Sequence, residues 1–174
     1  MKFEDLVIGQ FNEMAVKASE MVMESPGRDY PVLIIQGEFG SGKSSLVKAI
    51  ENKAGGKLTV KFCTCKNFMY EMNQSMRDHT YGGIFKALES VDILIIEDLQ
   101  EFSNQTETQH TIHKAIKNRV TNKKQTIITT SLPIDTIDGI TEELESFLKS
   151  SLVVEIHEPC FEDKILIKKT YCEF

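Results

Sequence analysis

The fold of this chain is decided by the stretch Gly37-Glu38-Phe39-Gly40-Ser41-Gly42-Lys43-Ser44. This stretch fits the phosphate-loop pattern G-x-x-x-x-G-K-[ST] at every fixed position. The apolar run 32–35 before it predicts a buried strand, and residues 45–52 after it predict a helix. A strand, a glycine-rich loop and a helix in this order surround a phosphate with backbone N–H groups. The sequence therefore predicts that all eight residues bind a nucleotide, with Lys43 at the β- and γ-phosphates and the Ser44 hydroxyl on Mg²⁺.

Two acidic residues follow a second buried strand. The apolar run 93–96 is unbroken, and Glu97 and Asp98 come directly after it. Ligands of open α/β sheets bind at the carboxyl ends of the strands, where this pair is delivered. In such a site the first acid holds the Mg²⁺ shell and the second polarises the attacking water. We therefore expect Glu97 at the metal and both Glu97 and Asp98 in catalysis.

A third polar residue stands at the end of another strand. The strand predicted over 125–130 is followed by Ser131. If this strand lies between the strands at 32–36 and 93–96, Ser131 lies between the phosphate loop and the two acids. That is the position of a γ-phosphate sensor, so Ser131 is a candidate catalytic residue. The alternative is that hydroxyl residues at a strand end only cap the backbone.

Helices and strands alternate along the chain with short connections, which predicts a parallel sheet covered on both faces. We expect a single α/β domain over 1–174 with the P-loop NTPase fold of the AAA+ type, a three-layer sandwich around a five-stranded parallel sheet. The predicted strands are 32–36, 58–63, 93–96, 125–130 and 152–156. The predicted helices are 12–24, 45–52, 66–76, 83–88, 106–122, 141–149 and 162–169, with a break at 78–82.

The composition is typical of a soluble globular protein, since 41% of the 174 residues are hydrophobic and 26% are charged. The apolar runs are too short to span a bilayer, and the first residues do not resemble a signal peptide. We therefore expect a cytoplasmic protein without membrane contact. The cysteines show no zinc-finger spacing, which favours reduced thiols; they are Cys63, Cys65, Cys160 and Cys172.

The net charge of −6 and the pI near 5.3 argue against a surface devoted to nucleic acid. We expect no sequence-specific duplex binding and at most weak single-strand binding, through Lys66 and Arg77 or through a predicted basic helix. That helix carries a set of basic residues, namely Lys114, Lys117, Arg119, Lys123 and Lys124. Such a set is usually a solvated helix face, with nucleic-acid contact as the alternative.

Four further segments resemble one known family in their order and spacing. These are residues 3–9 with Asn12, residues 26–31, residues 91–100 and residues 124–131. Together with the phosphate loop they resemble the ATPase core of the bacterial replication initiators of the DnaA family, within the AAA+ superfamily. The resemblance implies that ATP or ADP binds with Mg²⁺. It also implies that the residues that cup the adenine are Val7, Ile8, Gly9 and Asn12.

The chain departs from the family pattern at positions that affect hydrolysis. Glu97 stands where relatives have Asp, Ser131 where they have Asp or Asn, and Phe147 where they have the arginine finger. The chain also ends where the helical lid would begin. These departures imply weak or absent ATP hydrolysis and a replication-associated regulator that acts through protein contacts.

Three alternatives remain open from the sequence. The first is a helicase loader like DnaC or a transposition-helper ATPase. The second is a small-molecule kinase, which the scarcity of arginine disfavours, since only Arg28, Arg77 and Arg119 are present. The third is a paralogue whose nucleotide site is vestigial.

Overall fold

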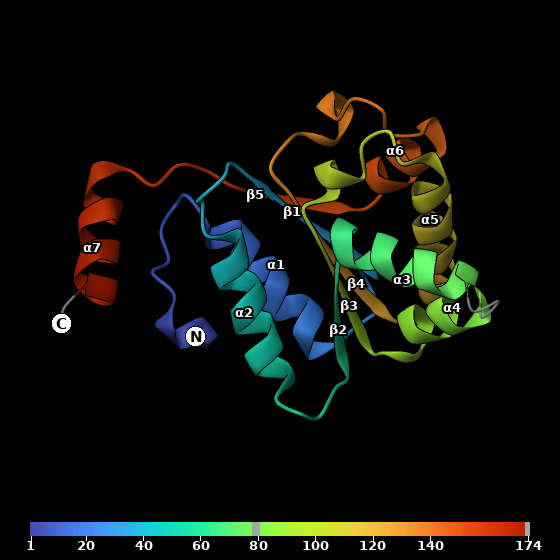
Figure 1. Ribbon diagram of the computed structural model, residues 1–174. Helices are drawn as coiled ribbons and strands as arrows, with labels where there is room; N and C mark the ends of the chain where they lie inside the picture. The colour runs from blue at the N-terminus through green and yellow to red at the C-terminus, as the bar shows by residue number, and fades with distance from the viewer. Residues whose placement is uncertain (78–80, 173–174) are drawn as a thin grey trace.

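The computed structural model describes residues 1–77 and 81–172 and places five parallel strands at its centre (Figure 1). The strands are β1 (Val32–Gly37), β2 (Val60–Thr64), β3 (Ile93–Glu97), β4 (Gln125–Thr130) and β5 (Leu152–Ile156). Their order in the sheet is β2-β3-β4-β1-β5, and every neighbouring pair is parallel. The predicted five-stranded parallel sheet is confirmed. The insertion of β4 between β1 and β3 is also confirmed, and it brings the ends of these three strands to one edge.

Helices cover both faces of the sheet because the strands bury side chains on both sides. In β1, Leu33 and Ile35 belong to one hydrophobic core, and Val32 and Ile34 belong to the other. The first core lies under α1 (Glu13–Glu24) and α2 (Lys43–Ala54). The second lies under the helices of the opposite face, which are α3 (Cys65–Arg77), α4 (Tyr81–Ser90), α5 (Thr106–Thr121) and α6 (Glu142–Lys149). The three-layer architecture is therefore the predicted one.

The helical excursion between β2 and β3 is confirmed as two helices, α3 and α4. The predicted break at 78–82 falls largely on 78–80, which lie outside the described residues. Three short 3₁₀ helices were not expected: η1 (Phe3–Asp5), η2 (Leu99–Phe102) and η3 (Ile134–Thr136). Of these, η2 directly follows the acidic pair and thereby shapes the candidate site.

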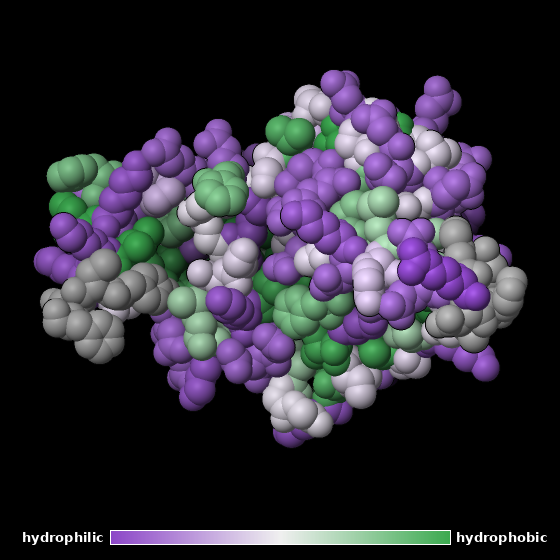
Figure 2. Space-filling model, in the orientation of Figure 1, coloured by the Kyte–Doolittle hydropathy of each residue, from purple (hydrophilic) through white to green (hydrophobic). Residues whose placement is uncertain are grey.

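The last helix, α7 (Phe161–Cys172), lies beside the N-terminal segment (Figure 1). Its Ile167 packs against the core of α1 and α2, whereas Phe161 and Ile165 are exposed. Figure 2 shows apolar and hydrophilic residues interspersed on α7 at the left of the view. Within the described part of the chain, no helix has the length and apolarity needed to cross a membrane.

The expectation of one basic helix face is wrong for Arg119, whose side chain is fully buried. Its guanidinium donates to four carbonyls and to Thr126 Oγ1; the carbonyls are those of Leu88, Val91, Asp92 and Gln125. Burial lowers the pKa of Arg119 to about 10. Lys123 and Lys124 also lie beyond the end of α5, and Lys124 Nζ donates to the Ser90 carbonyl at 2.5 Å. Of the expected basic face, only Lys114 and Lys117 remain as exposed residues of α5.

Candidate nucleotide site

The phosphate loop connects β1 to α2 and depends on its glycines. A Cβ on Gly37 would lie 2.6 Å from the Ile156 carbonyl oxygen and 2.7 Å from Ser41 Oγ. Gly42 precedes α2 with a φ of 103°, in the left-handed region that only glycine enters without strain. These constraints fix a tight turn whose N–H groups stand at the start of α2, as anion binding requires.

Lys43 and Ser41 occupy the interior of this loop. Lys43 is only 8% exposed, and its Nζ donates to the Gly37 carbonyl at 2.5 Å and to the Glu38 carbonyl at 2.9 Å. Burial lowers the pKa of Lys43, an effect that the charge of Asp98 partly offsets. Ser41 Oγ is buried and has no hydrogen-bond partner among the described residues. A desolvated cation beside an unsatisfied hydroxyl forms a site that an anion would complete.

The other variable loop residues, Glu38 and Phe39, lie on an exposed tip. Glu38 contributes only its carbonyl to Lys43, and the Phe39 ring is 98% exposed. Ser44 is exposed in the first turn of α2. The structure therefore places Ser41, Gly42 and Lys43 at the centre of the loop and the residues before them at its rim.

A cavity of about 210 Å³ opens directly beside the loop. It is lined by residues of the N-terminal segment, the loop and α2, and the C-terminal segment: Leu6, Val7, Phe11, Asn12, Val16, Gly40, Ser41, Gly42, Ser45, Leu46, Ile156, Pro159 and Ile167. Most of these walls are apolar, and the polar groups come from Asn12, the loop and Ser45 of α2. Apolar walls with a few fixed polar groups are the usual setting for a planar base.

The four residues expected to cup adenine do not all reach this cavity. Val7 and Asn12 line it, whereas Ile8 is 50% exposed and faces outside it. Asn12 Nδ2 donates to the Val7 carbonyl at 2.9 Å, and the Gly9 N–H donates to Asn12 Oδ1 at 3.0 Å. Asn12 therefore holds the turn at residues 7–9 in place, a positioning role that the sequence did not predict. Ile8 contributes no wall to this cavity, so the contact of all four residues with adenine stays a prediction.

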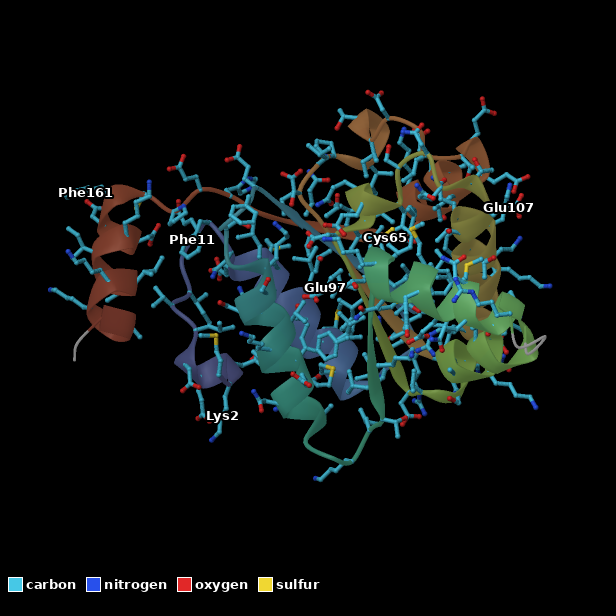
Figure 3. All side chains as sticks on the ribbon, in the orientation of Figure 1. Lys2, Phe11, Cys65, Glu97, Glu107 and Phe161 are labelled. Atoms are coloured by element: carbon cyan, nitrogen blue, oxygen red, sulfur yellow. The ribbon has the colours of Figure 1, made fainter. Side chains whose placement is uncertain are left out.

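The acidic pair lies at the same sheet edge as the loop. Glu97 ends β3 near the middle of the molecule, whereas Phe11 lies toward α7 (Figure 3). Burial raises the pKa of Glu97, the neighbouring charge of Asp98 raises it further, and Lys48 opposes the rise. Two carboxyl groups in a partly buried setting favour a cation, and hydroxyl and carboxylate oxygens are ligands that Mg²⁺ accepts. Ser44 and Glu97 are therefore chemically suited to the metal.

Asp98 adopts a conformation that is unusual for a residue other than glycine. Its φ of 55° and ψ of 62° lie in the left-handed region. Its N–H donates to Thr129 Oγ1 at 3.1 Å, across the boundary between β3 and β4. Thr129 was missed as a site residue, since the sequence marked only a strand-end hydroxyl cluster. The neighbouring Thr130 makes the expected backbone cap instead, donating to the Leu132 carbonyl at 2.8 Å.

Ser131 lies close to Asp98, as the sensor prediction requires, but Gln100 connects the two. Gln100 Nε2 is 3.2 Å from Asp98 Oδ1 and 3.3 Å from Ser131 Oγ, and Gln100 Oε1 accepts the Ser131 N–H at 3.1 Å. Gln100 ends the stretch 91–100 that resembles the family, but the sequence alone did not predict this bridging contact. The structure thus brings together Lys43, Glu97, Asp98 and Ser131.

Phe147 contributes packing on the opposite face of the sheet. It lies on α6, and its ring centroid is 5.1 Å from that of His113 on α5. This position therefore supplies an aromatic contact within the protein and no cation.

Comparisons with known proteins agree with this geometry. A family model described as the bacterial DnaA ATPase domain matches residues 1–155. The chromosomal replication initiator protein DnaA of Nautilia profundicola is 32% identical over 171 residues, covering 98% of this chain and 39% of that protein. The DnaA of Campylobacter fetus is 31% identical, covering 99% of this chain. The chain spans only about 40% of the length of such relatives.

Solved structures give the same result. Domain III of DnaA from Thermotoga maritima has a TM-score of 0.91 at 26% identity, covering 97% of this chain and 72% of that one. AMPPCP-bound DnaA from Aquifex aeolicus has a TM-score of 0.90 at 25% identity, and the match covers 97% of this chain and 53% of that one. The DnaC helicase loader shares the fold alone, at 18% identity and a TM-score of 0.71. That match covers 87% of this chain and 92% of the loader chain. This chain belongs to the bacterial DnaA ATPase-domain family of the AAA+ superfamily.

Proposed function

We propose that the chain binds ATP and ADP with Mg²⁺, and that it acts as a cytoplasmic, replication-associated regulator through protein contacts. The base would occupy the cavity against Val7 and Asn12, and the phosphates would rest on residues 37–44. The observation that carries the proposal is the interior of the loop, where Lys43 is desolvated and Ser41 Oγ has no partner among the described residues. The relative from Aquifex aeolicus, whose structure contains AMPPCP, supports the choice of an adenine nucleotide.

Ser44 and Glu97 would hold the Mg²⁺ ion. When bound, such an ion neutralises charge that develops on the β- and γ-phosphates. Asp98 would orient and polarise the attacking water, and Ser131 would contact the terminal phosphate. A bound cation would favour the charged form of Glu97, which burial and the charge of Asp98 both disfavour in its absence.

Hydrolysis by the chain alone would be slow. Ser131 has a shorter reach than the Asp or Asn of relatives, and Phe147 offers no positive charge at the position of the arginine finger. An arginine finger contributes roughly three to five orders of magnitude to turnover. A regulator that senses the bound nucleotide fits these properties better than a fast motor.

A helicase-loader role is the second candidate, because the fold is also that of the DnaC and DnaI structures. The two candidates differ in their partners. A loader would bind a replicative helicase, whereas a DnaA-type regulator would bind an initiator or another AAA+ ATPase. Pull-down from the native extract with ATP and with ADP would separate them, because the retained partner identifies the role.

Nucleotide binding can be tested by isothermal titration of the purified chain with Mg-ATP and Mg-ADP. Lys43→Ala should remove most of the binding, because it deletes the only cation in the loop. Lys53→Ala is the matched control, since Lys53 is an exposed lysine in the last turn of the same helix. Absence of nucleotide binding by the natural chain would refute the proposal. An equal loss of binding in Lys43→Ala and Lys53→Ala would show that Lys43 has no specific role.

A further inference from the structure

One side-chain amide joins the two candidate catalytic groups that come from different strands. Gln100, on η2, donates from Nε2 toward Asp98 Oδ1 at 3.2 Å and toward Ser131 Oγ at 3.3 Å. Its Oε1 accepts the Ser131 backbone N–H at 3.1 Å. The amide therefore uses both its donor and its acceptor side within the site.

The position of Asp98 depends on these neighbours. A non-glycine residue in the left-handed region costs about 1 kcal/mol and persists only where the surroundings hold it. The backbone of Asp98 is held by Thr129 Oγ1, and its carboxylate is held by Gln100. Loss of the amide would leave the backbone fixed and the carboxylate without its protein donor at Oδ1.

The contact with Ser131 has a different consequence. A serine hydroxyl has one proton to donate and two lone pairs that accept. When Gln100 Nε2 donates to Ser131 Oγ, the hydroxyl proton is free to point away from Gln100. That is the orientation needed to donate to an oxyanion. The same Gln100 amide therefore orients the Ser131 hydroxyl proton and positions the Asp98 carboxylate.

We propose that Gln100 is a positioning residue that couples Ser131 to Asp98. When a terminal phosphate binds at Ser131, Gln100 would transmit this contact to the Asp98 carboxylate and change its position. The inference rests on the proposed nucleotide binding and adds to it a route by which the site distinguishes ATP from ADP. If Gln100 served only to attach η2 to β4, its loss would lower the affinity for both nucleotides equally.

The test compares dissociation constants for ADP and for a non-hydrolysable ATP analogue in a double-mutant cycle of Gln100→Ala and Ser131→Ala. Each single change should lower the preference for the triphosphate about fivefold, equivalent to one hydrogen bond of about 1 kcal/mol, with ADP affinity unchanged within about twofold. The double variant should lose no more than either single variant, because both changes break one connection.

Two further variants keep the test decisive. The Gln100→Glu side chain has the same shape and still accepts from the Ser131 N–H. As an ionised carboxylate, however, it has no proton to donate to Asp98. It should lose the preference for the triphosphate even if Gln100→Ala folds poorly. Gln105→Ala is the control, since Gln105 precedes α5 and its side chain bonds to none of the described residues.

The outcomes separate this inference from the proposed function. If the natural chain binds neither nucleotide, both fail. If it binds both, but Gln100→Glu keeps the preference for the triphosphate or the effects of the two single changes add, only the coupling is overturned. A loss of preference confined to the Gln100 and Ser131 variants supports the coupling.

Discussion

Asn12 donates to the carbonyl of Val7 at 2.9 Å, and this bond fixes the wall of the cavity against which a base would rest. The amide oxygen of Asn12 accepts the Gly9 N–H, so both ends of the amide contribute to the shape of the turn. If a base binds there as proposed, its selection would depend on how well the turn at residues 7–9 is held.

We expect Asn12→Ala to weaken ATP and ADP binding by the same factor, about fivefold, because one hydrogen bond contributes about 1 kcal/mol. Titration with ATP, ADP and GTP measures the effect, and the preference for ATP over GTP should fall as well. Gln10→Ala, an exposed neighbour in the sequence, serves as the control. An unchanged ATP affinity in Asn12→Ala would show that the turn does not carry the base.

Val7 and Ile8 should respond differently to the same change. Val7→Asp places a charge in the cavity wall and should lower ATP affinity at least tenfold, which corresponds to about 1.4 kcal/mol. Ile8→Asp should stay within about twofold of the natural chain, because Ile8 is half exposed and faces away from the cavity. A larger effect at Ile8 than at Val7 would mean that the base lies on the other side of the segment.

Turnover by the isolated chain should stay below about one per second, at the low end of the enzyme range. Asp98→Asn should abolish what turnover exists and leave nucleotide affinity nearly unchanged, because Asp98 would act on the water. Phosphate release and titration on the same preparation measure the two quantities. Fast turnover, or turnover that persists in Asp98→Asn, would contradict the assignment.

Nucleic-acid contact should be weak and confined to single strands. The exposed face of α3 carries Lys66, Tyr70 and Arg77, and the Tyr70 ring is 65% exposed. A base that stacks on an aromatic ring gains about 1–3 kcal/mol, and contacts between phosphate and lysine or arginine weaken as salt rises. Tyr70→Ala should reduce single-strand binding in fluorescence anisotropy, whereas Tyr30→Ala should not. Salt-resistant binding to a particular duplex would restore an initiator-like role.

Asp92 gives a pH-dependent prediction. The Thr59 N–H and hydroxyl each donate to Asp92 Oδ2 at 2.8 Å, and the backbone bond is the leading cause that lowers the pKa of Asp92. A depressed carboxyl pKa stabilises the fold above the unfolded pKa, near 3.9, and this stability is lost as the pH falls through the folded value. A full hydrogen bond of about 1 kcal/mol would correspond to about 2–4 °C in Tm, and solvent screens this partly exposed carboxylate. Asp92→Asn should therefore lower Tm at pH 7 by less than that amount.

The difference in Tm between the natural chain and Asp92→Asn should shrink as the pH falls below about 4. Thermal unfolding at pH 7, 5 and 3 checks this, with the exposed Asp29→Asn as the control. A difference that stays constant over this range would mean that the carboxylate charge has no part in the effect.

The sequence predicted the regular elements better than their connections. The bounds of β4 and β5 agree with the prediction, because both strands combine apolar residues with clear turn signals at their ends. Strand β2 was expected at 58–63 and lies at Val60–Thr64. Thr59 lies just before β2, where its N–H and hydroxyl donate to the Asp92 carboxylate and its carbonyl accepts from the Asp92 and Ile93 N–H groups.

The parts of the site that could not be predicted depend on contacts between distant segments. The phosphate loop and the acidic pair follow from local patterns, and the structure places them at one sheet edge as expected. The role of Gln100 depends on the left-handed turn at Asp98, which no residue type announces. Arg119 follows the spacing of a helix surface, yet its long side chain passes beneath the helix to the carbonyls that end α4 and precede β3.

The buried guanidinium of Arg119 has a consequence for experiments that neutralise positive charge. All of its hydrogen-bond partners are neutral oxygens, and the nearby charges of Asp92 and Glu89 also favour its charged form. Lysine, with three donors on a single atom, cannot replace this fork. A scan that replaces the basic residues of α5 one at a time would therefore register unfolding at this position and could mistake it for lost DNA binding.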